Sequence, residues 1–145
     1  MHIVAFYNNY NPGETLSQIL DSKCQRRHTI NVASQYLLVI TSVPSKTVAQ
    51  KLTAIALNLH LAACVQVTAP LTSTYWWQKR IESSEERLCI FKTDLRHYRK
   101  LEQVIKQIHP YEIPEIIALP VITGSEKYLC WLTQELQPPI KKKKR

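Results

Sequence analysis

One short segment reads His109-Pro110-Tyr111-Glu112-Ile113-Pro114-Glu115 and separates a helical pattern from a short apolar strand. Each proline restricts the residue before it to extended backbone, so the helix must end at His109. The two prolines also keep the loop stiff. Because the loop carries an imidazole, a phenol and carboxylates, two interpretations stay open. It is either a rigid loop that presents polar groups to a ligand or a partner chain, or a helix end and a strand start whose polar groups are simply solvated.

A helix precedes this segment, and a strand and a shorter helix follow it. Asp94 is a suitable N-cap for the first helix, whose apolar residues recur every three or four positions. These residues are Leu95, Tyr98, Leu101, Ile105 and Ile108. Residues 115–121 are mostly apolar and predict a strand. Gly124-Ser125 then opens a last helix, which Pro138 ends.

Another strand and another helix begin the patterned part of the chain. Residues 36–41 form a nearly continuous apolar run, which is typical of a central strand. The helix that follows has Pro44 in its first turn. Its apolar face is formed by Val48, Leu52, Ile55 and Leu59.

Two further strands predict a long hairpin between these elements. Residues 61–67 begin the second strand, and residues 72–77 are rich in strand formers. Residues 87–93 predict the third strand. The polar residues between them place the hairpin tip near Glu82-Ser83-Ser84.

The order strand, helix, strand, strand, helix, strand predicts the α+β class. We expect a ferredoxin-like split βαβ sandwich with a four-stranded antiparallel sheet, a long hairpin between the second and third strands, and an extra C-terminal helix. Two helices would cover one face of the sheet. The other face would expose Val65 and Val67, Leu88 and Ile90, or their alternates. An uncovered face and a long aromatic hairpin predict an oligomer.

The chain of 145 residues predicts one domain with an extension at each end. Residues 1–35 are expected to be an N-terminal extension that is poorly ordered or lies on the surface. Residues 36–137 form the ferredoxin-like domain and can bury a core without disulfides or metal. Residues 138–145 form a basic tail, which we expect to be solvated.

The formal net charge of +8 is concentrated at the ends of the chain. Residues 141–145 supply five positive charges, whereas residues 36–140 carry 11 basic and 9 acidic side chains, which leaves +2. A body this close to neutral predicts no nucleic-acid binding. No apolar run is long enough for a membrane span, and no secretory signal is apparent. The four cysteines, none in a C-x-x-C pair, are therefore expected to be reduced thiols in a cytoplasmic protein.

Several motifs follow one another in a recognisable order. They are Leu61-Ala62-Ala63-Cys64-Val65, Tyr75-x-Trp77, Glu85-Glu86, Lys92-Thr93, His109-Pro110-Tyr111-Glu112-x-Pro114-Glu115-Ile116 and Tyr128-Leu129-x-Trp131-Leu132. Together they resemble the CutA family of divalent-cation tolerance proteins over about Leu37 to Leu136. The resemblance implies a cytoplasmic homotrimer whose hairpins pair with neighbouring subunits, in an architecture similar to the PII signalling proteins. It also implies a role in tolerance to copper and other divalent ions, and no reaction.

The hairpin departs from the family at two positions. Family members usually have Gly-Lys before an apolar residue and Glu, whereas this chain has Lys79 and Arg80 before Ile81 and Glu82. Arg80 keeps the positive charge but presents it as a planar fork rather than a point. The loss of the glycine is expected to alter the turn at Lys79.

The first functional hypothesis is a site for copper or another divalent cation. Copper(I) prefers thiolate and imidazole ligands, and Cys64 and His109 are the soft ligands inside the matching motifs. Two ligands are too few for a tight site in one subunit, so Glu112 or a neighbouring chain would supply a third. The alternatives are that Cys64 is a buried strand cysteine and that His109 is a helix C-cap.

The second hypothesis is a PII-like trimeric sensor or scaffold that binds an anionic ligand in clefts between subunits. Two cations beside aromatic rings would suit a planar anion. The residues expected to line such a cleft are Arg80, Lys92, Tyr111 and Trp131. The alternative for the two cations is ion pairing across the hairpin with Glu82, Glu85 or Glu86.

The third hypothesis is an enzyme, and the sequence does not support this hypothesis. Ser73, Ser83 and Ser84 have no histidine and carboxylate partners in a recognisable order. Glu112 and Glu115 alternate across an extended chain and need not face each other. We therefore expect no catalytic activity.

Overall fold

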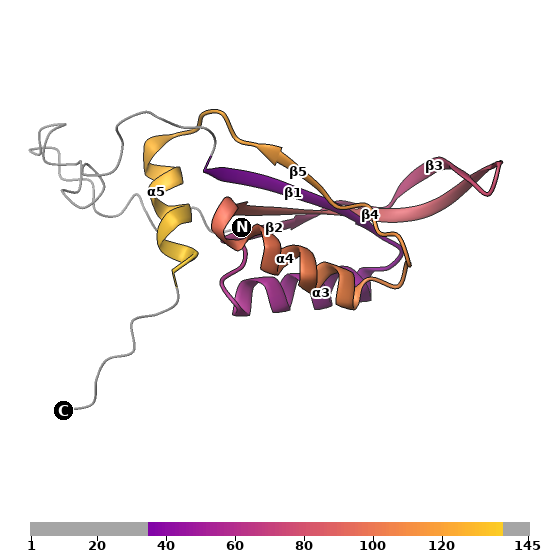
Figure 1. Ribbon diagram of the computed structural model, residues 1–145, viewed down its shortest axis with the longest axis horizontal. Helices are drawn as coiled ribbons and strands as arrows, with labels where there is room; N and C mark the ends of the chain where they lie inside the picture. The colour runs from indigo at the N-terminus through magenta and orange to yellow at the C-terminus, as the bar shows by residue number, and fades with distance from the viewer. Residues whose placement is uncertain (1–34, 138–145) are drawn as a thin grey trace, which may run out of the picture. The chain divides into compact units, whose positions relative to one another are not determined.

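The computed structural model describes residues 35–137, so the predictions for residues 1–34 and for the basic tail lie outside the described residues. The elements follow the predicted order, except that the predicted second strand is divided in two (Figure 1). They are β1 (Tyr36–Val43), α3 (Lys46–Asn58), β2 (Cys64–Val67), β3 (Leu71–Trp77), β4 (Arg80–Asp94), α4 (Leu95–Ile108), β5 (Ile117–Pro120) and α5 (Glu126–Glu135). None of these described helices is long and apolar enough to cross a membrane.

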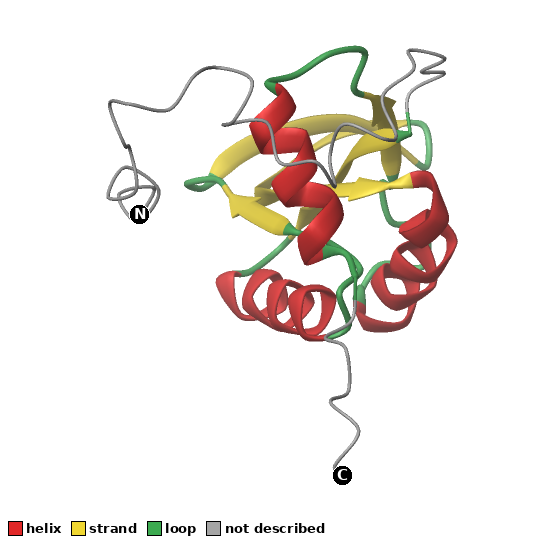
Figure 2. Cartoon of the chain, turned by 90° about the vertical axis from the view of Figure 1, so that its left-hand side faces the viewer, coloured by secondary structure: helices red, strands yellow, loops and turns green. Residues whose placement is uncertain are grey.

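The sheet has the strand order β2-β4-β1-β5, and each neighbouring pair is antiparallel. The helices α3 and α4 pack on one face of the sheet (Figure 1). The helix α5 lies at the end of the sheet that is far from the β3–β4 hairpin (Figure 2). This is the ferredoxin-like arrangement, so the predicted fold class is confirmed. The strand β3, which is the second piece of the predicted second strand, pairs only with residues 80–86 of β4.

The main core lies between the sheet and the helices α3 and α4. Val39 of β1 and Phe91 of β4 are register partners, and both are fully buried. Leu52 of α3 and the α4 residues Leu101 and Ile105 belong to the same cluster and have no exposed surface. Each such side chain contributes about 1.5–3 kcal/mol by leaving water. The core therefore fixes the two helices on the centre of the sheet.

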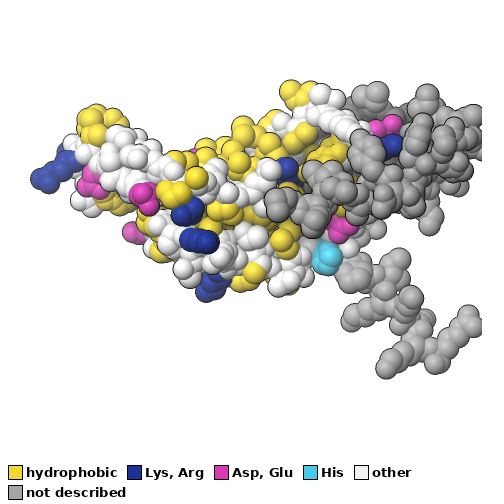
Figure 3. Space-filling view, turned by 180° about the vertical axis from the view of Figure 1, so that it is seen from behind, with side chains coloured by type: hydrophobic (Ala, Val, Ile, Leu, Met, Phe, Trp, Pro, Cys, Tyr) yellow, Lys and Arg dark blue, Asp and Glu magenta, His cyan; other side chains and the backbone are white. Residues whose placement is uncertain are grey.

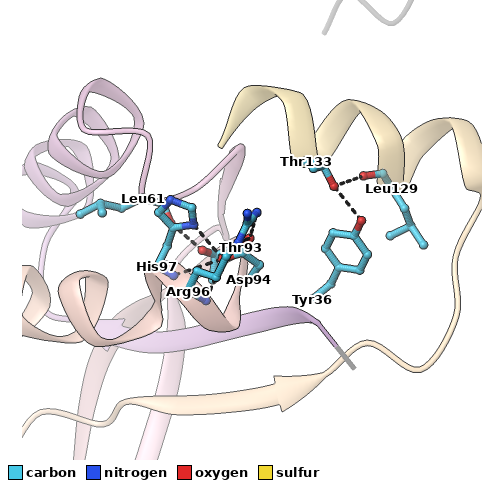
Figure 4. Close-up of polar contacts among 8 residues, drawn as sticks. All are labelled: Tyr36, Leu61, Thr93, Asp94, Arg96, His97, Leu129 and Thr133. Carbon is cyan, nitrogen blue, oxygen red and sulfur yellow. Dashed lines mark hydrogen bonds and ion pairs between the residues drawn. The ribbon is translucent and has the colours of Figure 1, made fainter. Parts of the chain in front are cut away.

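A second, smaller cluster holds α5 against the end of the sheet. Leu132 and Leu136 are buried together with Tyr36. The Tyr36 hydroxyl oxygen lies 2.7 Å from that of Thr133 (Figure 4). The Thr133 hydroxyl also lies 3.0 Å from the Leu129 carbonyl, to which it donates. Packing and hydrogen bonds together position the C-terminal helix.

Asp94 is the N-cap of α4, as the sequence predicts. Its Oδ1 accepts hydrogen bonds from the backbone N–H groups of Arg96 and His97, at 3.0 and 3.1 Å (Figure 4). Burial acts to raise the pKa of Asp94, but hydrogen bonds and charges from the Arg96 and His97 side chains outweigh burial and lower this pKa. The carboxylate therefore stabilises the fold above its ordinary pKa, and this contribution is lost as pH falls through the lowered folded value.

The sheet face opposite α3 and α4 is largely apolar, and α5 reaches one end of it, where Tyr36 and Lys92 lie. Its residues alternate with the core residues of the same strands. Its apolar residues are Leu38, Ile40, Ile90, Ile117 and Leu119, which we call the open face, and Lys92 lies opposite Leu38 on the same side of the sheet. Ile117 is 49 % exposed and Leu119 is 44 % exposed. In Figure 3, hydrophobic side chains gather over the middle of the molecule, beyond the base of the hairpin.

The hairpin turns at Gln78 and Lys79, so the prediction of a tip near Glu82-Ser83-Ser84 is wrong. Trp77 pairs with Arg80, which leaves a two-residue loop. The φ angles of Gln78 and Lys79 are 47° and 66°. Two central residues with positive φ are typical of a type I′ turn, whose twist matches that of a hairpin. The polar residues that resembled a turn instead lie within β4.

Lys79→Gly should stabilise the protein. Lys79 has a φ of 66°, and this left-handed conformation costs a residue with a side chain about 1–2 kcal/mol. The greater freedom of glycine in the unfolded chain offsets about 0.4–1 kcal/mol of the benefit. We expect the free energy of unfolding to rise by about 0.5–1 kcal/mol in chemical denaturation. Arg80→Gly, one residue further along in β4, is the control and should destabilise; equal effects of the two changes would contradict strain at the turn.

Candidate functional site

A hollow of about 780 Å³ lies between the β3–β4 hairpin and the loop that follows α4. Aromatic rings line it from both sides, with Tyr75 and Trp77 on β3 and Tyr111 on the loop. We call it the Tyr111 pocket. The segment 109–115 therefore presents polar groups to a cavity, which supports the first of its two interpretations.

His109 fixes the loop that forms one wall of this pocket. It is the C-cap of α4, and its backbone N–H donates to the Ile105 carbonyl at 2.8 Å. The buried ring donates from Nε2 to the Ser42 carbonyl at 2.6 Å, and Nδ1 accepts the backbone N–H of Tyr111 at 3.1 Å. These partners assign the ring proton to Nε2. The imidazole thereby ties the end of α4 to β1 and holds Tyr111 at the pocket.

Four carboxylates line the pocket, whereas no lysine or arginine of the described residues does so. They are Glu82 and Glu86 of β4 and Glu112 and Glu115 of the loop. Glu86 is only 4 % exposed. Burial raises the pKa of the Tyr111 phenol, and the neighbouring Glu86 carboxylate raises it further. An acidic hollow with aromatic walls attracts cations.

One copy of the chain does not assemble the predicted metal site. Cys64 is half-buried at the start of β2, opposite Lys92. Glu112 lines the Tyr111 pocket, and His109 uses both ring nitrogens within its own chain. Across residues 35–137, no three His, Cys, Asp or Glu side chains form a group that could hold a metal ion.

The four residues predicted to bind an anion lie in three places. Lys92 Nζ is 5.6 Å from the centroid of the Tyr128 ring, and the Tyr128 centroid is 5.4 Å from that of Trp131. Arg80 follows the hairpin turn, and Tyr111 lies in its pocket. Among the ion pairs of the described residues, none involves Arg80 or Lys92. The expected pairing with hairpin glutamates is therefore not observed.

The sequence did not reveal that Tyr75, Trp77 and Glu86 face one cavity. The shared face follows from the register, in which Tyr75 lies opposite Glu82, because residues two apart on a strand share a face. Because the sequence pattern places the hairpin tip several residues too late, it pairs the wrong residues of the two strands and does not bring these side chains to one face. The available signal is the polar series Glu82, Ser84 and Glu86 at every second position.

The fold and the pocket define a ferredoxin-like α+β protein with a long hairpin and an acidic cavity beside it. Residues 37–135 match the family described as CutA1 divalent ion tolerance protein. The chain belongs to this family, and the resemblance that its motifs predict is confirmed.

Relatives in three organisms illustrate the match. The chain is 39 % identical over 97 residues to the divalent-cation tolerance protein CutA of Thermus thermophilus, an alignment that covers 67 % of this chain and 94 % of that protein. The solved Thermus structure matches with a TM-score of 0.66. CutA from Xylella fastidiosa matches with a TM-score of 0.70 at 32 % identity, covering 72 % of this chain and 100 % of the other. CutA1 from Oryza sativa matches with a TM-score of 0.67 at 35 % identity, covering 69 % and 92 %. The Thermus protein is named for tolerance to divalent cations, not for an enzymatic reaction.

His109→Ala should destabilise the protein strongly. The change leaves the Ser42 carbonyl and the Tyr111 N–H without their ring partners and opens a cavity. We expect a loss of about 3–5 kcal/mol in the free energy of unfolding. The control is His60→Asn, because His60 contacts the Glu135 carbonyl at an exposed position and asparagine tolerates its φ of 53°. That control should cost less than about 1 kcal/mol, and an equally small loss at His109 would contradict its role as a clamp.

Proposed function

We propose that the chain acts in divalent-cation tolerance as a cytoplasmic homotrimer that binds the metal ion, with copper as the first candidate, and that it catalyses no reaction. The open face is the observation that carries this proposal, because a large apolar patch on a single chain marks an interaction surface. Family membership supports the role in tolerance, since the matching relatives carry that description. The number of three copies rests on the family resemblance.

Assembly would bury apolar surface that one chain leaves in water. The open face contributes apolar side chains from the central strands and from the edge strand β5, which carries Ile117 and Leu119. The hairpin adds Trp76 and Ile81, which are register partners and are 72 % and 64 % exposed. A cross-strand pair of this kind offers a neighbouring hairpin an apolar contact. A second copy of the chain is the occupant that fits both surfaces, because both are apolar and continuous with strand edges.

A metal ion would take ligands from more than one copy, because one copy does not assemble three. Cys64 has a free, half-buried thiol, and Glu112 has an exposed carboxylate. His109 would bind metal through Nδ1 only by releasing the Tyr111 N–H. Cys64 is therefore the predicted ligand most available for binding, and its thiolate favours copper(I).

A PII-like sensor or scaffold is the second candidate. It is favoured by the position of Lys92 over the ring of Tyr128, which in turn neighbours Trp131. A planar anion could stack on these rings and pair with the ammonium group. Arg80 would have to come from the hairpin of a neighbouring copy, as the family resemblance implies.

Leu119→Glu should dissociate the trimer, because each copy would place an unpaired carboxylate in the apolar interface. Native mass spectrometry should show a threefold mass for the parent and a single-chain mass for the variant, with a dissociation constant raised by about 100-fold or more. The control is Leu95→Glu, which introduces the same charge at a position on α4 that is 57 % exposed and lies outside the open face. A monomeric parent, or a trimer in both variants, would contradict assembly through the open face.

Cys64→Ser should weaken copper(I) binding by about tenfold or more, because a hydroxyl is a poor ligand for a soft ion. Protein purified without chelator is measured by native mass spectrometry before and after copper is added under reducing conditions. Cys130→Ser is the matched control, since Cys130 is also a free, half-buried cysteine. Unchanged copper uptake by the Cys64→Ser variant would contradict a metal site at Cys64. An organic anion that co-purifies with the parent and is lost in Lys92→Met would favour the sensor.

A further inference from the structure

We propose that the Tyr111 pocket binds a linear aliphatic polyamine, an organic cation with two or more ammonium groups. This site lies on the hairpin side of the sheet and does not require the metal site at Cys64. It rests on a buried carboxylate without a countercharge, a buried hydroxyl oxygen that accepts no hydrogen bond, and aromatic walls.

Glu86 supplies the buried carboxylate. The residue is 4 % exposed and lines the pocket. Within the part of the chain that the structure describes, no lysine, arginine or histidine forms an ion pair with it. The Tyr111 phenol beside it supplies no positive charge, and burial together with the Glu86 carboxylate raises the pKa of this phenol. A cation that enters the pocket would therefore give this carboxylate the charged partner that it lacks.

Ser84 supplies the buried hydroxyl. Its Oγ lies beside the Tyr111 phenol and accepts no hydrogen bond from any described residue. Ser84 lies midway between Glu82 and Glu86 on β4 and directly opposite Ser73 of β3. Because these three neighbours line the pocket, strand alternation places the Ser84 hydroxyl on the same side. The N–H of a protonated amine is the donor that this oxygen lacks.

The spacing of the carboxylates favours an extended ligand. Glu82 and Glu86 are four positions apart on β4, or about 13 Å along the strand. Glu112 and Glu115 belong to the loop on the other side of the hollow. A single metal ion cannot contact carboxylates at this spacing, in keeping with the lack of any three-ligand group in residues 35–137. A linear amine with several ammonium groups can reach more than one of them.

The aromatic walls suit the rest of such a ligand. Tyr75, Trp77 and Tyr111 line the same hollow as the carboxylates. Their rings attract ammonium groups through cation–π contacts and accept methylene groups as apolar surface. The pocket volume of about 780 Å³ leaves room for a chain longer than that of a simple monoamine.

The proposal is tested by isothermal titration calorimetry of the full-length protein with spermidine. Separate titrations with 1,4-diaminobutane, butylamine and magnesium chloride at the same ionic strength vary the number and kind of charges. We expect affinity to fall in the order spermidine, diamine, monoamine, with magnesium no tighter than the diamine. Magnesium or butylamine bound as tightly as spermidine would overturn the polyamine class, and the absence of amine binding would overturn the site.

Charge-neutral variants locate the binding. Glu86→Gln should weaken spermidine binding by about tenfold or more, because it removes a charge-assisted contact in the dry part of the pocket. Glu82→Gln, at an exposed position of the same wall, should weaken it by about threefold and serves as the second variant if Glu86→Gln does not fold. Glu126→Gln removes the same charge from α5, outside the pocket, and should bind like the parent. Equal weakening in all variants would indicate general electrostatic attraction to carboxylates anywhere on the chain and would overturn the site.

Discussion

The ring of His109 is the constraint on which the hairpin end of the domain depends. It joins the end of α4 to β1 through the Ser42 carbonyl and holds the next loop through the backbone N–H of Tyr111. Pro110 has no N–H, so the loop cannot fasten itself to the helix end by a backbone hydrogen bond at that position. The imidazole supplies a donor and an acceptor on opposite sides of one rigid ring. The Tyr111 ring then packs edge-on against it, at 5.0 Å between centroids, and its phenol lies beside Glu86.

The long strand β4 forms the opposite wall of the pocket and fixes the position of its side chains. Its second half pairs with β1 and β2 and belongs to the core, whereas its first half pairs only with β3. Glu86 lies near the junction of the two halves, where the buried part of the strand begins. The core therefore fixes its side chain, which cannot swing out to water as a carboxylate on a mobile loop would. The strand therefore holds this carboxylate at the wall of the pocket, beside Tyr111.

The helices and the central strands could be predicted because burial imposes a period on the sequence, as at Leu52 and Leu101. The hairpin turn could not, since Gln78 and Lys79 lack the usual turn residues and yet adopt positive φ. The pocket depends on the β3–β4 register. Because the predicted hairpin tip lies several residues too late, the predicted register is wrong as well. The role of His109 depends on Ser42, 67 positions earlier in the chain, and no local pattern reports such a contact. Metal ligands are predicted from residue type alone. Residue type does not reveal whether an atom, such as Nδ1 of His109, already takes part in a hydrogen bond within the chain.

The two proposed cation sites are not independent, because Glu112 belongs to both. It lines the pocket in one chain, and it is the oxygen ligand that we propose for a metal ion bound between chains. If one carboxylate serves both ligands, binding linkage requires each ligand to lower the affinity for the other by the same factor. The pocket residues come from one chain, whereas the metal site needs a second copy. Organic cations would then oppose metal binding through the shared carboxylate without opposing assembly. A trimer of this kind would respond to the balance of metal and organic cations rather than to metal alone.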